Sequence, residues 1–208
     1  CKNVTALDLS HFDTGNVTCM AGMFSDCENL VALDLSHFDT GSVTSMFDMF
    51  YGCKNLTALD LSSFDTVYVD YMWGMFMNCE NLTDVKLSST VEGLGVRTFA
   101  GCSSLINIEI PESVTWIDEF VFSGCGIKEI KIPSGVTDIR RQSFEYCMNL
   151  IEIELPRSVV NVEWRAFDNC DNLQKITFYN PDCIICDYDG SNTIPENTII
   201  YPELFTAV

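Results

Sequence analysis

Residues 27–52, CENLVALDLSHFDTGSVTSMFDMFYG, decide the fold of this 208-residue chain. Nearly the same text precedes this stretch at 1–26 and follows it at 53–78, and weaker copies continue toward the C-terminus. One unit is therefore repeated along the chain. Because each unit buries its apolar side against its neighbours, such an array folds as one continuous body. We expect a single domain over 1–208.

Each copy opens with a cysteine, followed by apolar residues three, six and eight positions later, which are Leu30, Leu33 and Leu35 in the second copy. A phenylalanine stands three residues before the next cysteine. The opening cysteines are Cys1, Cys27, Cys53, Cys79, Cys102, Cys125, Cys147 and Cys170, and the phenylalanines are Phe24, Phe50, Phe76, Phe99, Phe122, Phe144 and Phe167. A period of about 20 to 29 residues with an L-x-x-L-x-L core is typical of a leucine-rich-repeat solenoid.

The alternation in Leu33-Asp34-Leu35 predicts a short strand with two inward leucines. Equivalent residues of stacked coils then lie about 4.8 Å apart and form columns of like side chains. A second short strand is predicted at V-x-x-I, as in 114–117, and one helical turn around each phenylalanine. The expected fold is mostly β, with short parallel strands in about eight coils.

The repeats are of two kinds. Residues 1–78 hold three long, 26-residue repeats, and residues 79–169 hold short repeats of 22–23 residues. The segment 170–208 begins in register but loses the pattern after Tyr179, so we expect 180–208 to cap the open end of the core, with the last few residues mobile.

The opposite end begins abruptly, because Cys1 is already in repeat phase. The chain therefore resembles a piece cut from an array whose leader lies upstream; a lipidated N-terminal cysteine is the alternative. An uncapped end would expose Leu7 and Leu9, which predicts self-association through 1–26.

The formal net charge is −19 and is spread along the chain. This charge argues against nucleic acid and anionic membranes as partners. No run of 18 uncharged apolar residues could span a membrane.

No catalytic residue, metal or cofactor is predicted. His11 and His37 occupy one repeat position, and Ser63 replaces them in the third copy, whereas a catalytic group is normally unique. The lone Cys183-x-x-Cys186 pair is a weak signal for zinc.

The repeat cysteines are expected to be free, buried thiols. The asparagines of the Cys-x-Asn text, such as Asn55 and Asn81, are expected to hydrogen-bond loop backbone. Two sets of aspartates also stack, and calcium could bridge them, but an aspartate at a corner more often caps its own turn. These sets are Asp8, Asp34 and Asp60, and Asp13, Asp39 and Asp65.

The text C-x-N-L-x-x-L-D-L-S-x-F-D-T…V…M…M-F closely resembles the long repeats of BspA-like leucine-rich-repeat proteins. Likewise, I-x-I-P-x-x-V-x-x-I…F-x-x-C resembles their short repeats, and 176–182 with 193–198 looks like their terminal repeat. The resemblance covers nearly the whole chain. It implies a bacterial or protist protein, on the cell surface or secreted, that adheres to host matrix proteins or to other cells without enzyme activity.

Two surfaces are candidates for binding protein partners. One is the outward row of the predicted strands, which ends at Thr177. The other is aromatic, with Tyr71 and Trp116 at equivalent outward positions around Gly93; scattered surface aromatics are the alternative. We predict a noncatalytic interaction module, or alternatively a structural spacer that carries other domains. The candidate residues are Asp8, Asp34, Asp60, Lys86, Glu109, Lys131 and Glu154 in the row, and Tyr68, Tyr71, Trp73 and Trp116 in the aromatic group.

Overall fold

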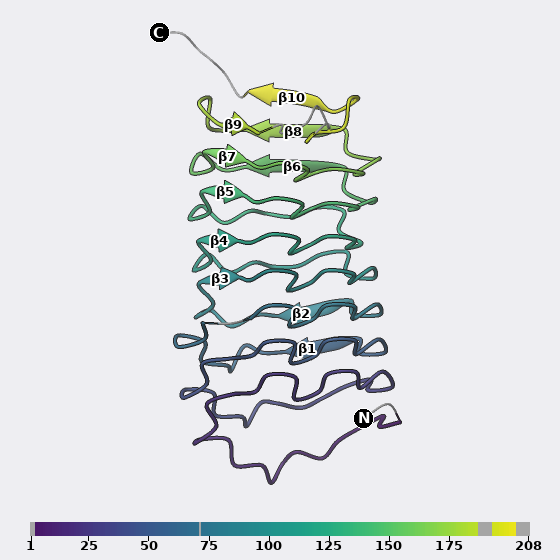
Figure 1. Ribbon diagram of the computed structural model, residues 1–208, viewed down its shortest axis with the longest axis vertical. Helices are drawn as coiled ribbons and strands as arrows, with labels where there is room; N and C mark the ends of the chain where they lie inside the picture. The colour runs from purple at the N-terminus through teal and green to yellow at the C-terminus, as the bar shows by residue number, and fades with distance from the viewer. Residues whose placement is uncertain (1–2, 71, 187–192, 203–208) are drawn as a thin grey trace.

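A computed structural model describes residues 3–70, 72–186 and 193–202. The chain winds into a stack of flat coils, and the two termini lie at opposite ends of the stack (Figure 1). This arrangement confirms the predicted leucine-rich-repeat solenoid. The fold follows from the period of the sequence, because equal residues of successive coils are superposed.

In the described residues, ten short strands pair in parallel. Strands at the L-x-L positions are β1 (Ala58–Asp60), β2 (Asp84–Lys86), β6 (Glu152–Leu155), β8 (Lys175–Phe178) and β10 (Ile199–Pro202). They form the sheets β1-β2 and β6-β8-β10. Strands at the V-x-x-I position form a five-stranded sheet on another wall: β3 (Gly93–Leu94), β4 (Trp116–Ile117), β5 (Asp138–Ile139), β7 (Asn161–Val162) and β9 (Ile184–Ile185). The second strand predicted from V-x-x-I is confirmed.

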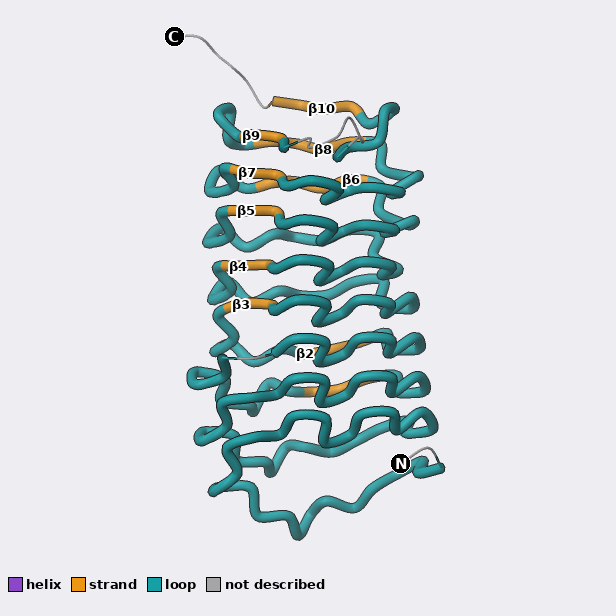
Figure 2. The backbone as a smooth tube through the Cα atoms, in the orientation of Figure 1, coloured by secondary structure: helices purple, strands orange, loops and turns teal. Residues whose placement is uncertain are grey.

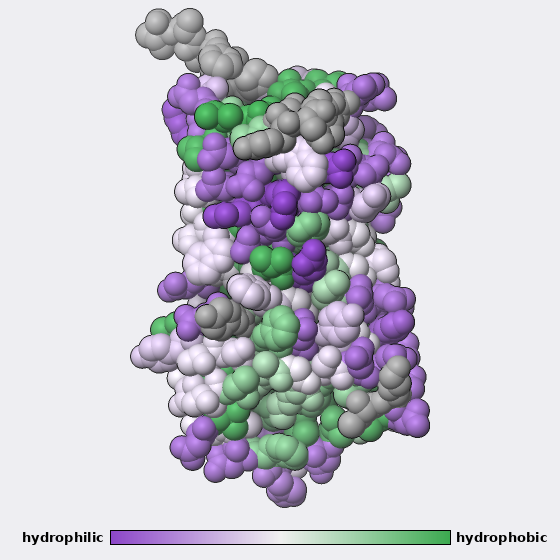
Figure 3. Space-filling model, viewed as in Figure 1, coloured by the Kyte–Doolittle hydropathy of each residue, from purple (hydrophilic) through white to green (hydrophobic). Residues whose placement is uncertain are grey.

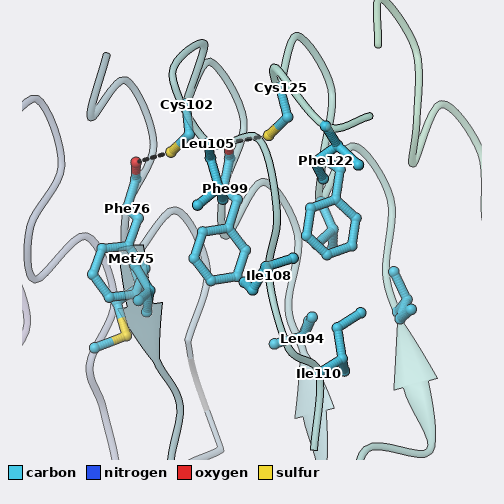
Figure 4. Packing of buried hydrophobic residues seen from close by; sticks show 14 of the residues in the cluster. Met75, Phe76, Leu94, Phe99, Cys102, Leu105, Ile108, Ile110, Phe122 and Cys125 are labelled. Atoms are coloured by element: carbon cyan, nitrogen blue, oxygen red, sulfur yellow. Dashed lines mark hydrogen bonds between the residues drawn. The ribbon is translucent and has the colours of Figure 1, made fainter. Parts of the chain in front are cut away.

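The interior is built from two columns of like residues. Seven phenylalanines, from Phe24 to Phe167, form the Phe ladder, in which neighbouring ring centroids are 5.2 to 5.7 Å apart and nearly parallel. Seven repeat cysteines, from Cys27 to Cys170, are buried and form no disulfide with another described residue, as predicted. Figure 4 shows the two columns side by side, with Phe99 between Phe76 and Phe122. Apolar burial along the whole stack is the main stabilising contribution.

The repeat cysteines are more than apolar filler. Each thiol from Cys53 to Cys170 donates a hydrogen bond to the carbonyl oxygen of a phenylalanine in the preceding coil, with sulfur-to-oxygen distances of 3.0 to 3.1 Å. Figure 4 marks the bonds of Cys102 and Cys125. Each of these carbonyl oxygens also accepts the backbone N–H of the cysteine three residues later, so the thiol adds a second bond that an aliphatic residue could not make.

The helical turn predicted around each phenylalanine is wrong, since no helix occurs in the described residues (Figure 2). Backbone N–H groups there alternate between two uses. The N–H of Phe24 donates to Met49 of the next coil, whereas the N–H of Cys27 donates to Phe24, three residues back. In an α-helix, each backbone N–H beyond the first turn would instead donate to the carbonyl oxygen four residues earlier in the same segment. Left-handed residues two positions before and after each phenylalanine, such as Asp48 (φ 53°) and Gly52 (φ 67°), also interrupt any helix.

The coil count is slightly lower than the predicted eight. The Phe ladder marks seven coils, and the parallel strands extend over about six turns. The tail also differs from the prediction, because both strand rows continue beyond Tyr179. Ile185 pairs with Val162, and Ile200 pairs with Ile176. The expected mobility of the last residues concerns 203–208, which lie outside the described part of the chain.

Exposure at the two ends differs from expectation. Leu7 is 38% exposed, as predicted, but Leu9 is buried because it joins the apolar core. At the other end, Ile199 and Ile200 of β10, which lies within the expected cap, are 56% and 46% exposed.

The asparagine prediction is wrong for Asn55 of the third long repeat and for Asn81 of the first short repeat. The side-chain amide of Asn55 donates to the amide oxygen of Asn29, and Asn81 donates to Asn55 in the same way. An amide carries both a donor and an acceptor, so stacked asparagines can satisfy each other. In the short repeats, Asn149 does donate to a backbone carbonyl, that of Gly126.

Candidate functional site

The outward positions of the L-x-L strands form one surface, which we call the strand face. In β1 and β2 the pattern is exposed, buried, exposed, because successive side chains of a strand point to opposite sides. The pairing places Asp60 beside Lys86 and Lys131 beside Glu154, as the predicted row requires. Thr177 is next to Glu154 but is only 3% exposed, so the row does not extend to the end of the stack as an accessible surface.

The aspartates of the long coils are bonded within their own turns. Asp8 and Asp60 each accept bonds from the backbone N–H and the hydroxyl of the serine two residues later. These serine bonds hold the pKa of Asp8 below its usual value. For Asp60, the bonds from Ser62 and the nearby Lys86 ammonium, whose nitrogen is 2.9 Å from the carboxylate, lower the pKa to about 2. The carboxylates therefore remain charged while they shape the turn.

The corner aspartates follow the same rule. Asp13 and Asp39 each accept a bond from the backbone N–H two residues later, at 3.2 and 3.1 Å. This agrees with the turn-capping alternative of the sequence analysis. No group of three or more His, Cys, Asp or Glu residues arranged to hold a metal ion occurs in the part of the chain that is described.

The short coils present a hollow on the strand face with a volume of about 910 Å³. Four carboxylates and two cations line it: Glu109, Glu129, Glu152, Glu154, Lys131 and Arg157. A second hollow of about 610 Å³ adjoins it and shares Asn107, Ile108 and Glu109. Together the two hollows follow the strand face from Asp84 to Tyr179.

Salt bridges within the chain leave some carboxylates of the hollow without a paired cation. Lys131 turns to the corner and pairs with Glu112, with 2.6 Å between its nitrogen and the carboxylate oxygen. Lys175 is 3.9 Å from Glu152. Glu109 and Glu129 form no salt bridge with any described residue. The hollow is therefore acidic, and the carboxylates of Glu109 and Glu129 are available to a partner.

Sequence reasoning found only one column of this hollow. It missed Glu129, Glu152, Arg157 and Tyr179. The hydroxyl of Tyr179 donates a hydrogen bond to Glu154 at 3.2 Å. A signal did exist, because each strand has a second outward position two residues earlier. That position holds Ala6, Ala32 and Ala58 in the long coils, but Asp84, Asn107, Glu129 and Glu152 in the coils that follow.

The aromatic candidates lie on a different wall from the strand face. Trp116 belongs to β4 of the five-stranded sheet, and Trp73 and Trp116 are each 45% exposed. Tyr68 is 64% exposed. Tyr71 lies outside the described residues. The structure therefore brings Trp73 and Trp116 to neighbouring positions near β3 but keeps them apart from the charged row.

Other polar groups make contacts between neighbouring coils or are buried inside them. A ring nitrogen of His37 is 2.7 Å from the carbonyl oxygen of Leu9. Burial raises the pKa of the Cys53 thiol to about 12 and raises that of Cys79 as well, so these thiols are neutral at neutral pH. Within the described ranges, there is no helix of the length and apolar character needed to cross a bilayer.

The repeated L-x-x-L-x-L coil, its parallel strand rows and the Phe ladder define a leucine-rich-repeat solenoid. The family model described as "BspA type Leucine rich repeat region" matches residues 73–188 with 6 copies. The chain therefore belongs to the BspA-type leucine-rich-repeat family. A second model, "Mycoplasma protein of unknown function, DUF285", matches residues 1–94. The boundary between the two matches falls near the change from long to short repeats.

Solved structures agree on the fold. The leucine-rich-repeat protein of T. pallidum is 28% identical, with a TM-score of 0.57 and 72% of each chain covered. A leucine-rich-repeat protein from Bacteroides ovatus is 21% identical, with a TM-score of 0.56; the match covers 86% of this chain and 54% of that one. No curated protein matches the chain. Family membership supports a protein-interaction module, and proteins of this family are generally non-catalytic.

Proposed function

We propose that this chain is the binding part of a bacterial cell-surface or secreted protein, and that it attaches the cell to host matrix proteins or to other cells. The observation that carries this proposal is the acidic hollow on the strand face of the short coils. Its floor is rigid, because the Phe and Cys columns fix each coil against the next. Solenoids offer extended surfaces of this kind to protein partners.

Charge complementarity indicates the chemistry of the partner. Four carboxylates face two cations in the hollow, and Glu109 and Glu129 form no salt bridge with a described residue. A partner segment that carries lysines or arginines would compensate them. Such contacts mainly raise the association rate and weaken with salt, because surface charges are screened over roughly 8 Å at physiological ionic strength.

A structural spacer is the second candidate. The regular stacking of the Phe ladder, with centroid spacings of 5.2 to 5.7 Å in both long and short coils, favours a stiff rod that displays other domains. A spacer needs no binding surface of its own. The two candidates therefore differ in whether this chain binds anything by itself.

Surface plasmon resonance against immobilised fibronectin, laminin and collagen tests the proposal. The double variant Glu129→Lys/Glu152→Lys reverses charge in the hollow, and Glu80→Lys/Asp171→Lys reverses two exposed charges elsewhere as a matched control. We expect binding to at least one matrix protein, a loss of roughly tenfold or more in the hollow variant, and little change in the control. No binding by the wild-type chain would favour the spacer, and equal losses in both variants would reject the hollow as the site.

A further inference from the structure

The side chains of Trp73 and Trp116 pack on the outer side of β3 and the glycine that follows it. Leu94 is buried, so its neighbours Gly93 and Gly95 both face outward. A Cβ on Gly93 would overlap with Cε2, Cδ2 and Cζ2 of Trp116, which are all atoms of its six-membered ring. The indole therefore lies flat on the backbone of Gly93, and the Trp116 side chain is still 45% exposed. On Gly95, a Cβ would come within 2.6 Å of Cδ1 of Trp73.

Other surface aromatics of this chain are covered by cations of the chain itself. Arg97 lies 4.5 Å above the ring of Phe120, and Arg165 lies 4.5 Å above the ring of Trp164. By contrast, none of the described lysines and arginines stacks on Trp116, although this side chain is 45% exposed. Its outer face offers the same attraction for a cation, because the face of an indole ring is electron-rich.

Carboxylates surround this open ring. Because Ile117 pairs with Ile139, Trp116 and Asp138 lie side by side, about 4.8 Å apart at the backbone. Asp138 accepts one bond on each oxygen, from Asn161 and from Thr137, both at 2.6 Å. These neutral donors fix the carboxylate without cancelling its charge, and a carboxylate can accept about four bonds in all.

Two more acidic residues and two cations are close to this position in the chain. Glu92 is adjacent to Gly93 in sequence, and the N–H of Asp118 donates to Leu94, which places Asp118 beside Gly95. Arg140 is two residues beyond Asp138, and Arg97 is two residues beyond Gly95 but lies over the ring of Phe120. By chain position, three carboxylates and two guanidinium groups stand near the indole, which leaves a small excess of negative charge.

We propose that Trp116, together with Asp138 and the neighbouring carboxylates, binds an arginine or lysine side chain of a partner polypeptide. The cation stacks on the open indole face and pairs with the carboxylate of Asp138. A sugar ring also stacks on tryptophan, but it does not need three carboxylates, so the charge favours the cation. This site lies on a different sheet from the acidic hollow, and it therefore stands whether or not the hollow binds a partner.

The indole N–H signals in ¹H–¹⁵N NMR spectra test this site directly, because the chain has 3 tryptophans. The probes are a hexa-arginine peptide, a hexa-citrulline peptide of equal length without charge, and maltohexaose, each in about 150 mM salt. We expect hexa-arginine to shift the signal of Trp116 and to shift that of Trp164 much less, because Arg165 already covers that ring. No shift at Trp116, or an equal shift with citrulline, overturns the proposal. A shift with maltohexaose alone assigns the site to sugars instead.

Variants measured with fluorescently labelled hexa-arginine give an independent test. Trp116→Leu should weaken binding about 2- to 30-fold, the range expected for loss of one cation–π contact. Trp164→Leu is the matched control and should leave affinity unchanged. Gly93→Ala should weaken binding as well, because the new methyl displaces the indole while every charge is kept. If both tryptophan variants bind as tightly as the wild type, the general charge of the chain holds the peptide and the site is rejected.

Discussion

In the long coils, the strand-face aspartates are bonded to serines of their own turns, whereas in the short coils Glu109 and Glu129 have no such bond. The long coils also carry buried threonines at the corner, and the short coils replace that corner with a proline turn, such as the one from Pro111 to Val114. On the face shown in Figure 3, apolar side chains gather in the centre of the N-terminal coils, hydrophilic ones form a band above the middle of the stack, and apolar ones reappear at the C-terminal end. One interior therefore supports two different outer surfaces.

The comparison teaches that polar residues of the long coils bond within the stack, whereas strand-face carboxylates of the short coils are left exposed. In the long coils, the hydroxyl of Thr40 donates to the carbonyl of Asp65 at 2.9 Å and accepts from the N–H of Asp65 at 2.8 Å. These groups are engaged within the fold. In the short coils, the backbone closes its own corners, which leaves the strand-face side chains exposed beside the acidic hollow.

The largest effect is expected in the Phe ladder, which the long and short coils share. Phe50→Ala in the long coils and Phe144→Ala in the short coils should each lower the free energy of unfolding by about 3–5 kcal/mol, because both rings are fully buried in the same ladder. Urea unfolding followed by circular dichroism measures the loss. A cost below about 1 kcal/mol for either variant, or a large difference between them, would contradict a common interior.

A smaller effect should separate the two regions. Thr40→Val should cost about 1–3 kcal/mol, because it removes two part-buried hydrogen bonds to the backbone of Asp65, each contributing roughly 0.5–1.5 kcal/mol. Thr115→Val in the short coils is the control and should change stability by no more than about 0.5 kcal/mol, since Thr115 is exposed. Equal costs would mean that the threonine column is not specific to the long coils.

Alkaline pH should weaken the cysteine column. The folded-state pKa of Cys53 is raised to about 12, above the ordinary value of 9.0. The protonated thiol is therefore favoured by folding, and its contribution is complete below pH 9 and lost as pH rises from 9 toward 12. Between pH 8 and pH 10, the wild type should lose about 1.4 kcal/mol more than Cys53→Ala does. Urea unfolding at the two pH values measures this difference. If the wild type and Cys53→Ala lose the same free energy of unfolding, this thiol ionises as readily in the folded state as in the unfolded state.

The smallest effect is expected at the junction of the two regions. Lys86 of β2 pairs with Asp60 of β1 across the change from long to short repeats, but both side chains are more than half exposed. Because exposed ion pairs contribute little, Lys86→Gln should leave the urea midpoint of unfolding unchanged within error. A clear shift of the midpoint would indicate that the junction depends on this pair.

Much of the fold could be predicted because the repeat period determines which residues coincide. The columns of phenylalanine and cysteine, the free thiols and both strand positions follow from superposing the copies. The backbone between them could not be predicted in the same way. A run such as 46–50 reads as a helical turn, yet the next coil takes every second N–H group, and this competition is visible only when neighbouring coils are in place.

For the candidate site, too, residue positions could be predicted from the sequence but their contacts could not. The row from Asp8 to Glu154 was predictable from alternation, but its chemical roles were not. Asp60 and Glu109 occupy equivalent positions, and only the structure shows that Asp60 is bonded to Ser62 whereas Glu109 lines the hollow. The seat of Trp116 on Gly93 also depends on register between coils. This last contact joins residues of different coils, whereas the bond between Asp60 and Ser62 is local.

Hydrogen exchange with mass spectrometry, with and without a bound matrix protein, tests the central claim most directly. The account predicts that binding slows exchange on the strand face of the short coils, at 107–110, 129–132 and 152–155, and leaves the equivalent long-coil segment 32–35 unchanged. Protection confined to the long coils, or spread equally over both regions, would contradict the claim that the acidic hollow is the binding surface.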